Sequence, residues 1–223
     1  MRLALFLFMF LAACGRPLTD GEARFAKAIH GDSIDTAKIR VADNTPLGTY
    51  AFDREKRPRL ACRERIFPEP KTTRVTGTPS AAVWLNSVLY SARAYRKDFM
   101  PDYPAQMDLY DAMLFAHELT HVWQWQNREA TGYSPFRSMR EHKVSEDPYL
   151  FDISTSTNFL DYGYEQQASI VEEYVCCHTL DPDAPRTQRI AAMLRGAFPM
   201  SELPRPEAVI LPWKGAKTEG ICR

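Results

Sequence analysis

The sequence predicts an α+β domain in which a small sheet of three to four strands packs on one long helix and a second helix. The chain has 223 residues, which is enough for one domain with its own hydrophobic core. Candidate strands are concentrated in the first half, whereas apolar residues recur at helical spacing in the second half. Hydrophobic residues make up 45% and charged residues 25%, as in soluble globular proteins. The 28 basic and 28 acidic side chains balance, so we expect no nucleic-acid partner, which would favour a basic surface.

The N-terminal residues predict export. A basic residue precedes an apolar run that is too short to span a bilayer, so residues 1–13 are predicted to be a signal peptide. The letters LAAC, ending at Cys14, resemble a bacterial lipobox, which implies cleavage before Cys14 and acylation of its sulfur. Gly15 in the second mature position then favours periplasmic attachment to the outer membrane, with residues 14–19 as a lipidated tether. The alternative is a plain signal peptide in which Cys14 is incidental.

One helix and three short strands are predicted in the first half of the chain. Thr19 and Glu22 have capping-box spacing and Gly31 is a stop signal, so residues 20–30 are predicted to be helical. Three further segments have the composition and the boundaries of strands. These candidate strands are residues 36–41, 63–67 and 82–90, of which the last is the longest.

The second half is predicted to be mainly helical. After a proline-bearing loop at 101–106, Asp108 is the expected N-cap of a long helix that runs to about Asn127. Apolar residues at helical spacing predict a second core helix at 163–178 and a third helix at 187–197.

Two segments show no such period. Residues 128–162 contain glycine and proline without helical or strand spacing, and they predict a long surface excursion over the functional face. Residues 199–223 contain several prolines and are predicted to be an extended tail. The compact domain would therefore cover residues 20–198.

The motif HELTH predicts a zinc site. Residues four apart on a helix lie on one face, so His117 and His121 present two imidazoles to one point. Glu118 lies one step around the helix, where its carboxylate can reach a zinc-bound water without ligating zinc. Zinc lowers the pKa of such a water from about 15.7 toward about 7, and Glu118 would accept the proton as general base. The alternative is a histidine pair on an amphipathic helix that binds no metal.

A catalytic zinc site needs a third protein ligand. No histidine follows at the spacing HExxHxxGxxH, which leaves the acidic residues of the next core helix as candidates. Glu165 and Glu172 are seven residues apart and share a helix face, whereas Glu173 points elsewhere. The alternative is that these glutamates are solvated charges, as most acidic side chains are.

Together, HELTHVWQ and the later run YGYEQQASIVEEY resemble the gluzincin metallopeptidases, the thermolysin-like class. The chain, including its N-terminal run LTDGEARFAKAIHGDSIDTAKIRV, is similar to a bacterial subgroup labelled as Vgr- or Rhs-related proteins. The resemblance implies a minimal gluzincin-like fold and a zincin-like metallopeptidase domain whose zinc ligands are the two motif histidines and Glu165. Ser169 stands where the family often has an aspartate that orients a zinc-bound histidine. Glu172 and Asp161 are the candidates for that role.

The resemblance also bears on how a substrate would be held. A long strand such as residues 83–89 would offer an edge with which a substrate backbone could pair, as in gluzincins. Tyr149, Tyr162 and Tyr164 are candidates for donating a hydrogen bond to the oxyanion of a tetrahedral intermediate. The sequence does not distinguish among these three tyrosines.

Four cysteines remain for disulfides in an oxidising compartment, namely Cys62, Cys176, Cys177 and Cys222. Adjacent helical residues point about a third of a turn apart, so Cys176 and Cys177 are not expected to pair with each other. Two bridges from this pair to Cys62 and Cys222 would connect the start and the end of the domain to its middle. The sequence leaves the order of pairing open, and the alternative is a free or zinc-binding thiol cluster.

Two functions are compatible with these patterns. The first is a zinc metallopeptidase, attached to the membrane through Cys14, that hydrolyses a peptide or protein substrate with Glu118 as general base. The second is a zinc-stabilised envelope assembly or secretion-system-associated protein with little or no catalysis, in line with the labels of the subgroup. Glu118 discriminates between them, because a purely structural zinc site is usually closed by four protein ligands and needs no base.

Overall fold

The computed structural model describes residues 15–43, 51–201 and 203–223. The predicted signal peptide and Cys14 lie outside the described residues. Within them, no helix combines the length and the apolar character of a membrane-spanning segment.

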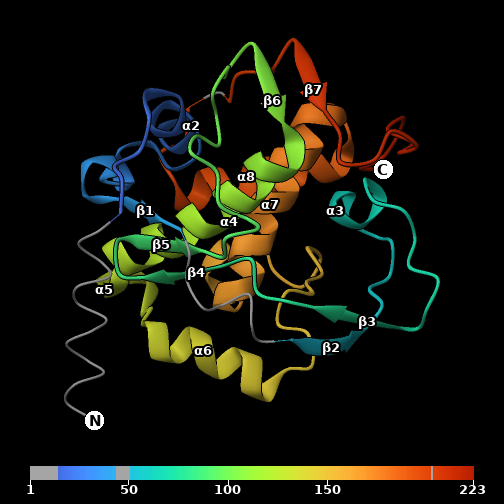
Figure 1. Cartoon of the computed structure of the whole chain (residues 1–223), viewed down its shortest axis with the longest axis horizontal. Helices are drawn as coiled ribbons and strands as arrows, with labels where there is room; N and C mark the ends of the chain where they lie inside the picture. Colours follow the sequence, from blue (N-terminus) through green and yellow to red (C-terminus); the bar gives the residue numbers. More distant parts are fainter. Residues whose placement is uncertain (1–14, 44–50, 202) are drawn as a thin grey trace.

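Most of the short strands precede residue 109, and the longest helices follow from there, before the last strand β7 (Figure 1). The helices are α2 (Asp20–His30), α3 (Cys62–Arg65), α4 (Leu109–Gln126), α5 (Arg128–Thr131), α6 (Pro135–Val144), α7 (Tyr164–Leu180) and α8 (Pro185–Ala197). The strands are β1 (Arg40–Ala42), β2 (Phe52–Glu55), β3 (Arg74–Gly77), β4 (Ala81–Trp84), β5 (Ser87–Tyr90), β6 (Gln106–Asp108) and β7 (Ala208–Ile210). Single 3-10 turns are η1 (Gly31–Ser33), η2 (Thr36–Lys38) and η4 (Phe159–Asp161).

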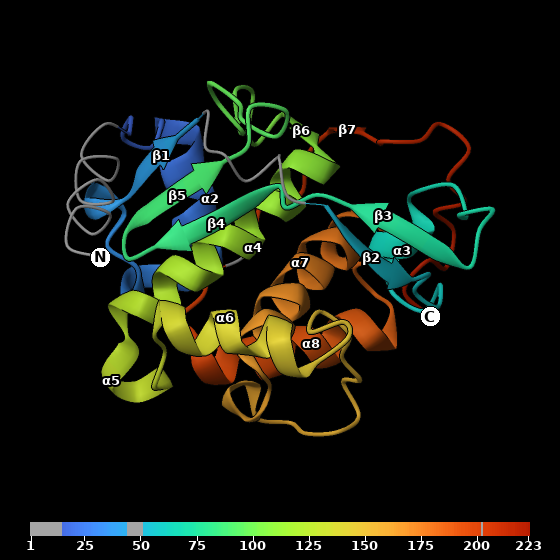
Figure 2. The ribbon, with the colours of Figure 1, turned by 60° about the horizontal axis from the view of Figure 1, so that its bottom comes forward.

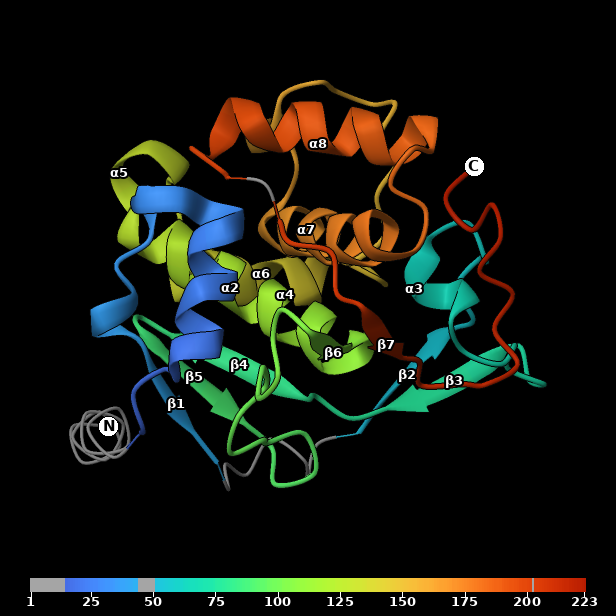
Figure 3. The same cartoon turned by 90° about the horizontal axis from the view of Figure 1, so that it is seen from above.

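The two longest helices lie between a small sheet and an outer helix (Figure 3). One side of α4 packs against β4 and β5 and the other side against α7, which packs in turn against α8. Side chains such as Phe115 and Leu119 of α4 and Ile170 and Val175 of α7 are fully buried. Burial of each side chain of this size stabilises the fold by about 1.5–3 kcal/mol. The contact between α4 and α7 is therefore both the centre of the core and a rigid frame for side chains that the two helices share.

Local capping signals begin the helices where the sequence predicts them. The N–H of Glu22 donates to the Thr19 hydroxyl at 3.2 Å and the N–H of Thr19 donates to the Glu22 carboxylate at 2.9 Å, which confirms the capping box of α2. Asp108 caps α4, and its Oδ1 accepts from the N–H of Asp111 at 3.0 Å. The predicted helices at 163–178 and 187–197 are confirmed as α7 and α8 with small changes at their ends.

A mixed α+β fold with a three-stranded sheet is confirmed, but the strands are arranged differently from the prediction. The strand order is β1-β5-β4, with β1 parallel and β4 antiparallel to β5. Residues 82–90 are not one strand but a hairpin, in which Trp84 pairs with Ser87 across a two-residue turn. The turn depends on a positive φ of 57° at Leu85, a conformation that leucine rarely adopts. Because no glycine or asparagine stands at this position, the sequence gives no signal for the turn.

Two other strand predictions were wrong in part or in full. Residues 36–41 begin as the 3-10 turn η2, whose N-cap Asp35 accepts from the N–H of Ala37, and only Arg40–Ala42 is a strand. Residues 63–67 lie mostly in the short helix α3. This helix is held by contacts from outside its own sequence, because the N–H of Cys62 donates to the carboxylate of Glu173 at 2.8 Å.

Residues 128–162 are more regular than the sequence predicts, although they do lie against the candidate site as expected. They contain α6, which begins after Ser134 with proline in its first turn, a favourable arrangement for a helix start. The tail after α8 also contributes to the fold, since β7 pairs in parallel with β6, Met107 opposite Val209. The pairing of β7 with β6 depends on residues distant in the sequence, whereas the signals that begin α6 are local.

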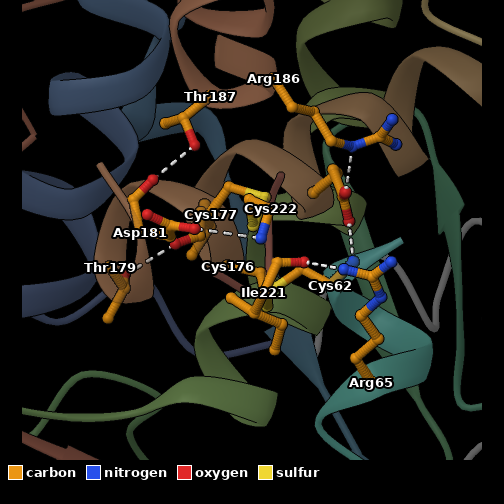
Figure 4. The surroundings of a disulfide bond; sticks show 12 residues. Cys62, Arg65, Cys176, Cys177, Thr179, Asp181, Arg186, Thr187, Ile221 and Cys222 are labelled. Atoms are coloured by element: carbon orange, nitrogen blue, oxygen red, sulfur yellow. Dashed lines mark hydrogen bonds and ion pairs between the residues drawn. A yellow bond between two sulfur atoms is a disulfide. The ribbon is translucent and has the colours of Figure 1, made fainter. Parts of the chain in front are cut away.

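Two disulfides join α7 to α3 and to the C-terminal tail (Figure 4). Cys62 of α3 is bonded to Cys176, and Cys222 of the tail is bonded to Cys177. The predicted pattern of two bridges from the adjacent pair is thus confirmed, and the structure supplies the order of pairing. Arg65 adds a direct link between the two ends, because its guanidinium donates to the carbonyl of Ile221 at 2.6 Å.

Candidate metal centre

Two histidines of α4 face one carboxylate of α7. His117 and His121 lie one turn apart on the side of α4 that packs against α7, and they are 7% and 4% exposed. Their Nε2 atoms lie 3.3 Å and 3.2 Å from the Oε2 atom of Glu165. Glu165 belongs to the first turn of α7 and is 5% exposed. The packing of the two helices therefore brings together the three side chains that were predicted as zinc ligands.

These three side chains form a group that could hold a metal ion. One ligand atom from each lies within 4.8 Å of the others. Zinc binds imidazole nitrogen and carboxylate oxygen at about 2.0–2.2 Å in tetrahedral geometry, which places neighbouring ligand atoms about 3.3 Å apart. The two Nε2–Oε2 separations of 3.3 Å and 3.2 Å fit this spacing. In the part of the chain that the structure describes, no fourth histidine, cysteine or acidic residue joins the group, so one tetrahedral position would stay open.

Both histidines are oriented by acceptors behind their rings. The Nδ1 atom of His121 lies 2.8 Å from Oε1 of Gln124, and the Nδ1 atom of His117 lies 3.4 Å from Oε2 of Glu172. Since both oxygens are acceptors, each Nδ1 carries a proton in the metal-binding form, which leaves Nε2 as the ligand atom. Glu172 is held in turn by the guanidinium of Arg63 at 2.9 Å. Gln124 was not predicted, although its place three residues after His121 puts it on the same face of α4.

The candidates for the orienting role are resolved by these contacts. Glu172 reaches His117, whereas Asp161 bonds to the side chains of Ser156 and Asn158 on a surface segment. Glu173 points away from the metal centre, as predicted, and its buried carboxylate accepts from Arg186 and from the backbone of Cys62.

Glu118 lies beside the two histidines and is 5% exposed. No hydrogen bond to its carboxylate is found among the described residues. Burial raises the pKa of Glu118, and the charges of His117 and His121 oppose this rise. A buried carboxylate whose oxygens are not occupied by protein donors is available to accept a proton from a water molecule.

Charges in the centre stabilise one another. Burial by itself would lower the pKa of His117, but hydrogen bonds to Glu165 and Glu172 raise it to about 10. Burial would raise the pKa of Glu172, but Arg63 and His117 lower it to about 2. The pKa of Glu165 lies well below its usual value because His121 and the histidine hydrogen bonds outweigh burial. The buried carboxylates thus favour positive charge at the imidazoles, which a divalent cation would also supply.

Helix α6 lies across α4 and α7 (Figure 2), and side chains from α6 and its flanking segments contact the candidate ligands. Ser138 and His142 of α6 both contact the Oε1 atom of Glu165. The ring of Tyr133 stacks on His121 at 6.1 Å between centroids, and the ring of Tyr149 lies 5.7 Å from His117. Ser138, His142 and Tyr133 were missed from the sequence because they belong to a segment whose helical period is short and weak.

Of the three tyrosines considered for the oxyanion, only Tyr149 is placed against a metal-centre histidine. The single hydroxyl proton of Tyr162 is within reach of the carbonyls of residues 152 and 156, and the hydroxyl of Tyr164 donates to the carbonyl of Gly132 at 2.9 Å. Burial raises the pKa of Tyr149 well above its usual value, so its phenol stays protonated and can act as a donor.

Comparisons with known proteins agree with the Vgr-related part of the predicted resemblance. No protein-family model matches the chain. The chain is 26% identical over 189 residues to the type VI secretion system spike protein VgrG2b of Pseudomonas aeruginosa, covering 84% of this chain but only 15% of that protein. Among solved structures, the effector domain of Pseudomonas aeruginosa VgrG2b matches with a TM-score of 0.52 at 24% identity, over 82% of this chain and 85% of that chain. The chain therefore shares its fold with the effector domain of VgrG2b.

Proposed function

We propose that the protein is a zinc-dependent metallopeptidase. The observation that carries the proposal is the meeting of His117, His121 and Glu165 at zinc-ligand spacing, with Glu118 buried beside them and one position open. Two imidazoles and one carboxylate with an open position form the ligand set of catalytic zinc sites. Zinc would supply Lewis acidity and would acidify a water molecule.

Residues of the chain would bind the metal, transfer the proton and stabilise the oxyanion. His117 and His121 would hold the metal through Nε2, because Glu172 and Gln124 occupy their Nδ1 atoms. Glu118 would accept a proton from the attacking water and pass it to the leaving nitrogen of the peptide. Tyr149 is the candidate donor to the oxyanion, since its ring lies against His117.

Strand β4 is the proposed docking edge for the substrate backbone. In the strand order β1-β5-β4 it is the terminal strand, and it packs on α4, the helix that carries the two histidines. An extended peptide that pairs with such an edge gains backbone hydrogen bonds without a requirement for one side-chain sequence. The peptide or protein substrate would therefore bind extended along β4.

The second candidate function is a zinc-stabilised, secretion-associated protein with little catalysis. Two observations favour it: the similarity to a type VI secretion system spike protein, and the low exposure of His117, Glu118, His121 and Glu165, none of which exceeds 7%. The open ligand position argues for the peptidase, because structural zinc sites are usually closed by four protein ligands.

The cellular setting remains the one that the sequence predicts. We propose that the chain is exported and attached to the membrane through an acylated Cys14. Mass spectrometry of the mature N-terminus tests this, and an unmodified residue 14 in the membrane fraction would remove the lipid anchor from the proposal.

Metal removal tests the proposed activity directly. The zinc-loaded chain is expected to cleave members of a broad peptide library, and a chelator should abolish cleavage that added zinc then restores. The measurement is mass spectrometry of the peptides before and after incubation. A fully zinc-loaded chain that cleaves no peptide or protein in the library would favour the assembly function.

Substitution of the third ligand should release the metal. In Glu165→Ala the two histidines lose the carboxylate that completes the site, so zinc binding should weaken by more than the roughly 10- to 100-fold typical of losing a residue that only supports a ligand. Zinc affinity is measured by competition with a chromophoric chelator. Glu146→Ala, an exposed carboxylate in the covering segment, is the matched control and should bind zinc as the wild type does. Unchanged affinity in Glu165→Ala would move the third ligand to Glu172 or elsewhere.

A further inference from the structure

The inner face of α6 makes four polar contacts with the first turn of α7. The Ser138 hydroxyl and the His142 Nε2 atom lie 3.1 Å and 3.0 Å from Oε1 of Glu165. The carboxylate of Glu141 accepts the N–H groups of Tyr164 at 2.8 Å and Glu165 at 3.0 Å. These N–H groups lie in the first turn of α7, where backbone N–H groups have no carbonyl acceptor within the helix. α6 therefore acts on both the backbone and the side chain of Glu165.

The opposite face of α6 shows that these polar contacts, rather than apolar burial, place the helix. Phe136, Met139 and Val144 are 70%, 58% and 73% exposed, whereas Ser138 is buried against α7. A surface helix normally buries its apolar face and exposes its polar one. In α6 the polar side faces the protein, and the residues on that side meet at the third metal ligand.

The two oxygens of Glu165 have separate partners. Oε2 faces the Nε2 atoms of His117 and His121, while the hydrogen-bond partners of Oε1 within the described residues are the two donors from α6. The terminal torsion of a glutamate is broad, so the side chain does not by itself determine which way its carboxylate plane is turned. Two hydrogen-bond donors on Oε1 restrict rotation about this torsion and thereby direct Oε2 toward the histidines.

We propose that Ser138 and His142 are positioning residues that hold Oε1 of Glu165 and thereby present Oε2 to the metal, an inference that rests on the proposed metal centre. A carboxylate oxygen only accepts, so the Nε2 of His142 is the donor in this contact. The ring of His142 is braced by Tyr149, whose centroid lies 5.5 Å away. His142 is not part of the ligand group, which consists of His117, His121 and Glu165.

Zinc affinity of the full chain tests the proposal without any measure of catalysis. Ser138→Ala and His142→Ala should each weaken zinc binding about 10-fold, within the range of roughly 10- to 100-fold for groups that support a metal ligand. His142→Gln keeps an N–H donor at a similar reach, and it should restore most of the affinity. Affinity is measured by chelator competition, and circular dichroism verifies that each variant is folded.

Two further measurements distinguish positioning from a general loss of structure. Met139→Ala alters the exposed face of the same helix and should leave zinc affinity unchanged. In the cobalt-substituted protein, the visible bands should change in Ser138→Ala and His142→Ala but not in Met139→Ala, because only the first two free the ligand carboxylate.

The outcomes separate this inference from the proposed function. Wild-type zinc affinity and wild-type cobalt bands in both Ser138→Ala and His142→Ala would overturn the positioning role alone. Equal losses in His142→Gln and His142→Ala would overturn the hydrogen-bond basis of the role. A wild-type chain that binds no zinc would overturn the metal centre, and the positioning role with it.

Discussion

The Glu118→Gln variant is expected to bind zinc as tightly as the wild type and to lose about 10²- to 10⁴-fold of its peptide cleavage, the usual contribution of a general base. A carboxamide has the shape of the carboxylate but cannot accept and pass on the proton. Because the carboxylate of Glu118 accepts no hydrogen bond within the described residues, the substitution removes its charge but no hydrogen bond that holds the fold. Zinc content and the rate of cleavage are measured on the same preparations.

The stability of this variant is a second readout. Burial raises the pKa of Glu118 more than the charges of His117 and His121 lower it, so the charged form of this side chain is disfavoured in the fold. We expect Glu118→Gln to unfold at a temperature no lower than the wild type, since a neutral amide is less costly to bury than a charge. A chain that keeps a destabilising group usually does so for activity. Zinc-loaded wild type and variant that both fail to cleave would instead favour the assembly function.

Loss of either disulfide is expected to destabilise the fold by about 4–5 kcal/mol, and only one of the two losses should affect the metal centre. Cys62–Cys176 and Cys177–Cys222 join residues 114 and 45 positions apart. In the loop-entropy model, bridges that close loops of these lengths stabilise the folded state by about 4–5 kcal/mol each. The free energy of unfolding is measured by chemical denaturation of two double variants, in each of which both cysteines of one bridge are replaced by alanine.

The two disulfides are expected to affect zinc affinity differently because they connect α7 to different segments. Cys62 ties α3 to α7, and α3 carries Arg63, which pairs with Glu172 and so supports the ring of His117. The second bridge holds the tail, where the N–H of Cys222 donates to the carboxylate of Asp181 at 3.2 Å, beyond the end of α7 (Figure 4).

The paired variants therefore serve as controls for each other. The double variant Cys62→Ala with Cys176→Ala should bind zinc several-fold more weakly, because Arg63 is no longer held in place. The double variant Cys177→Ala with Cys222→Ala should lose stability but keep its zinc affinity. Equal zinc affinity in both would show that the contact between Arg63 and Glu172 does not support the metal centre.

Features that depend on neighbours in the sequence were predicted well. The capping box of α2, the N-cap Asp108 and the helices α4, α7 and α8 follow from residues within a few positions of one another. The placing of His117 and His121 on one face of α4 is of the same kind, since a helix repeats every 3.6 residues. The strands were predicted less well. Leu85 adopts a positive φ without a glycine to signal it, and α3 is held on α7 by Cys62.

The sequence by itself determined a helix with two imidazoles on one side and an adjacent carboxylate, together with cysteines placed for two bridges. Helix phase left Glu165 and Glu172 open, the family resemblance implied Glu165, and the tertiary structure places Glu165 against the two histidines. Only the tertiary structure decided which residues orient the histidines and which cysteine pairs with which. Glu165 joins the histidines because α7 packs against α4, and Ser138 and His142 reach Glu165 because α6 caps the free end of α7. Helix period is a local property of the chain, whereas contacts across 44 or 114 positions depend on which faces are buried together.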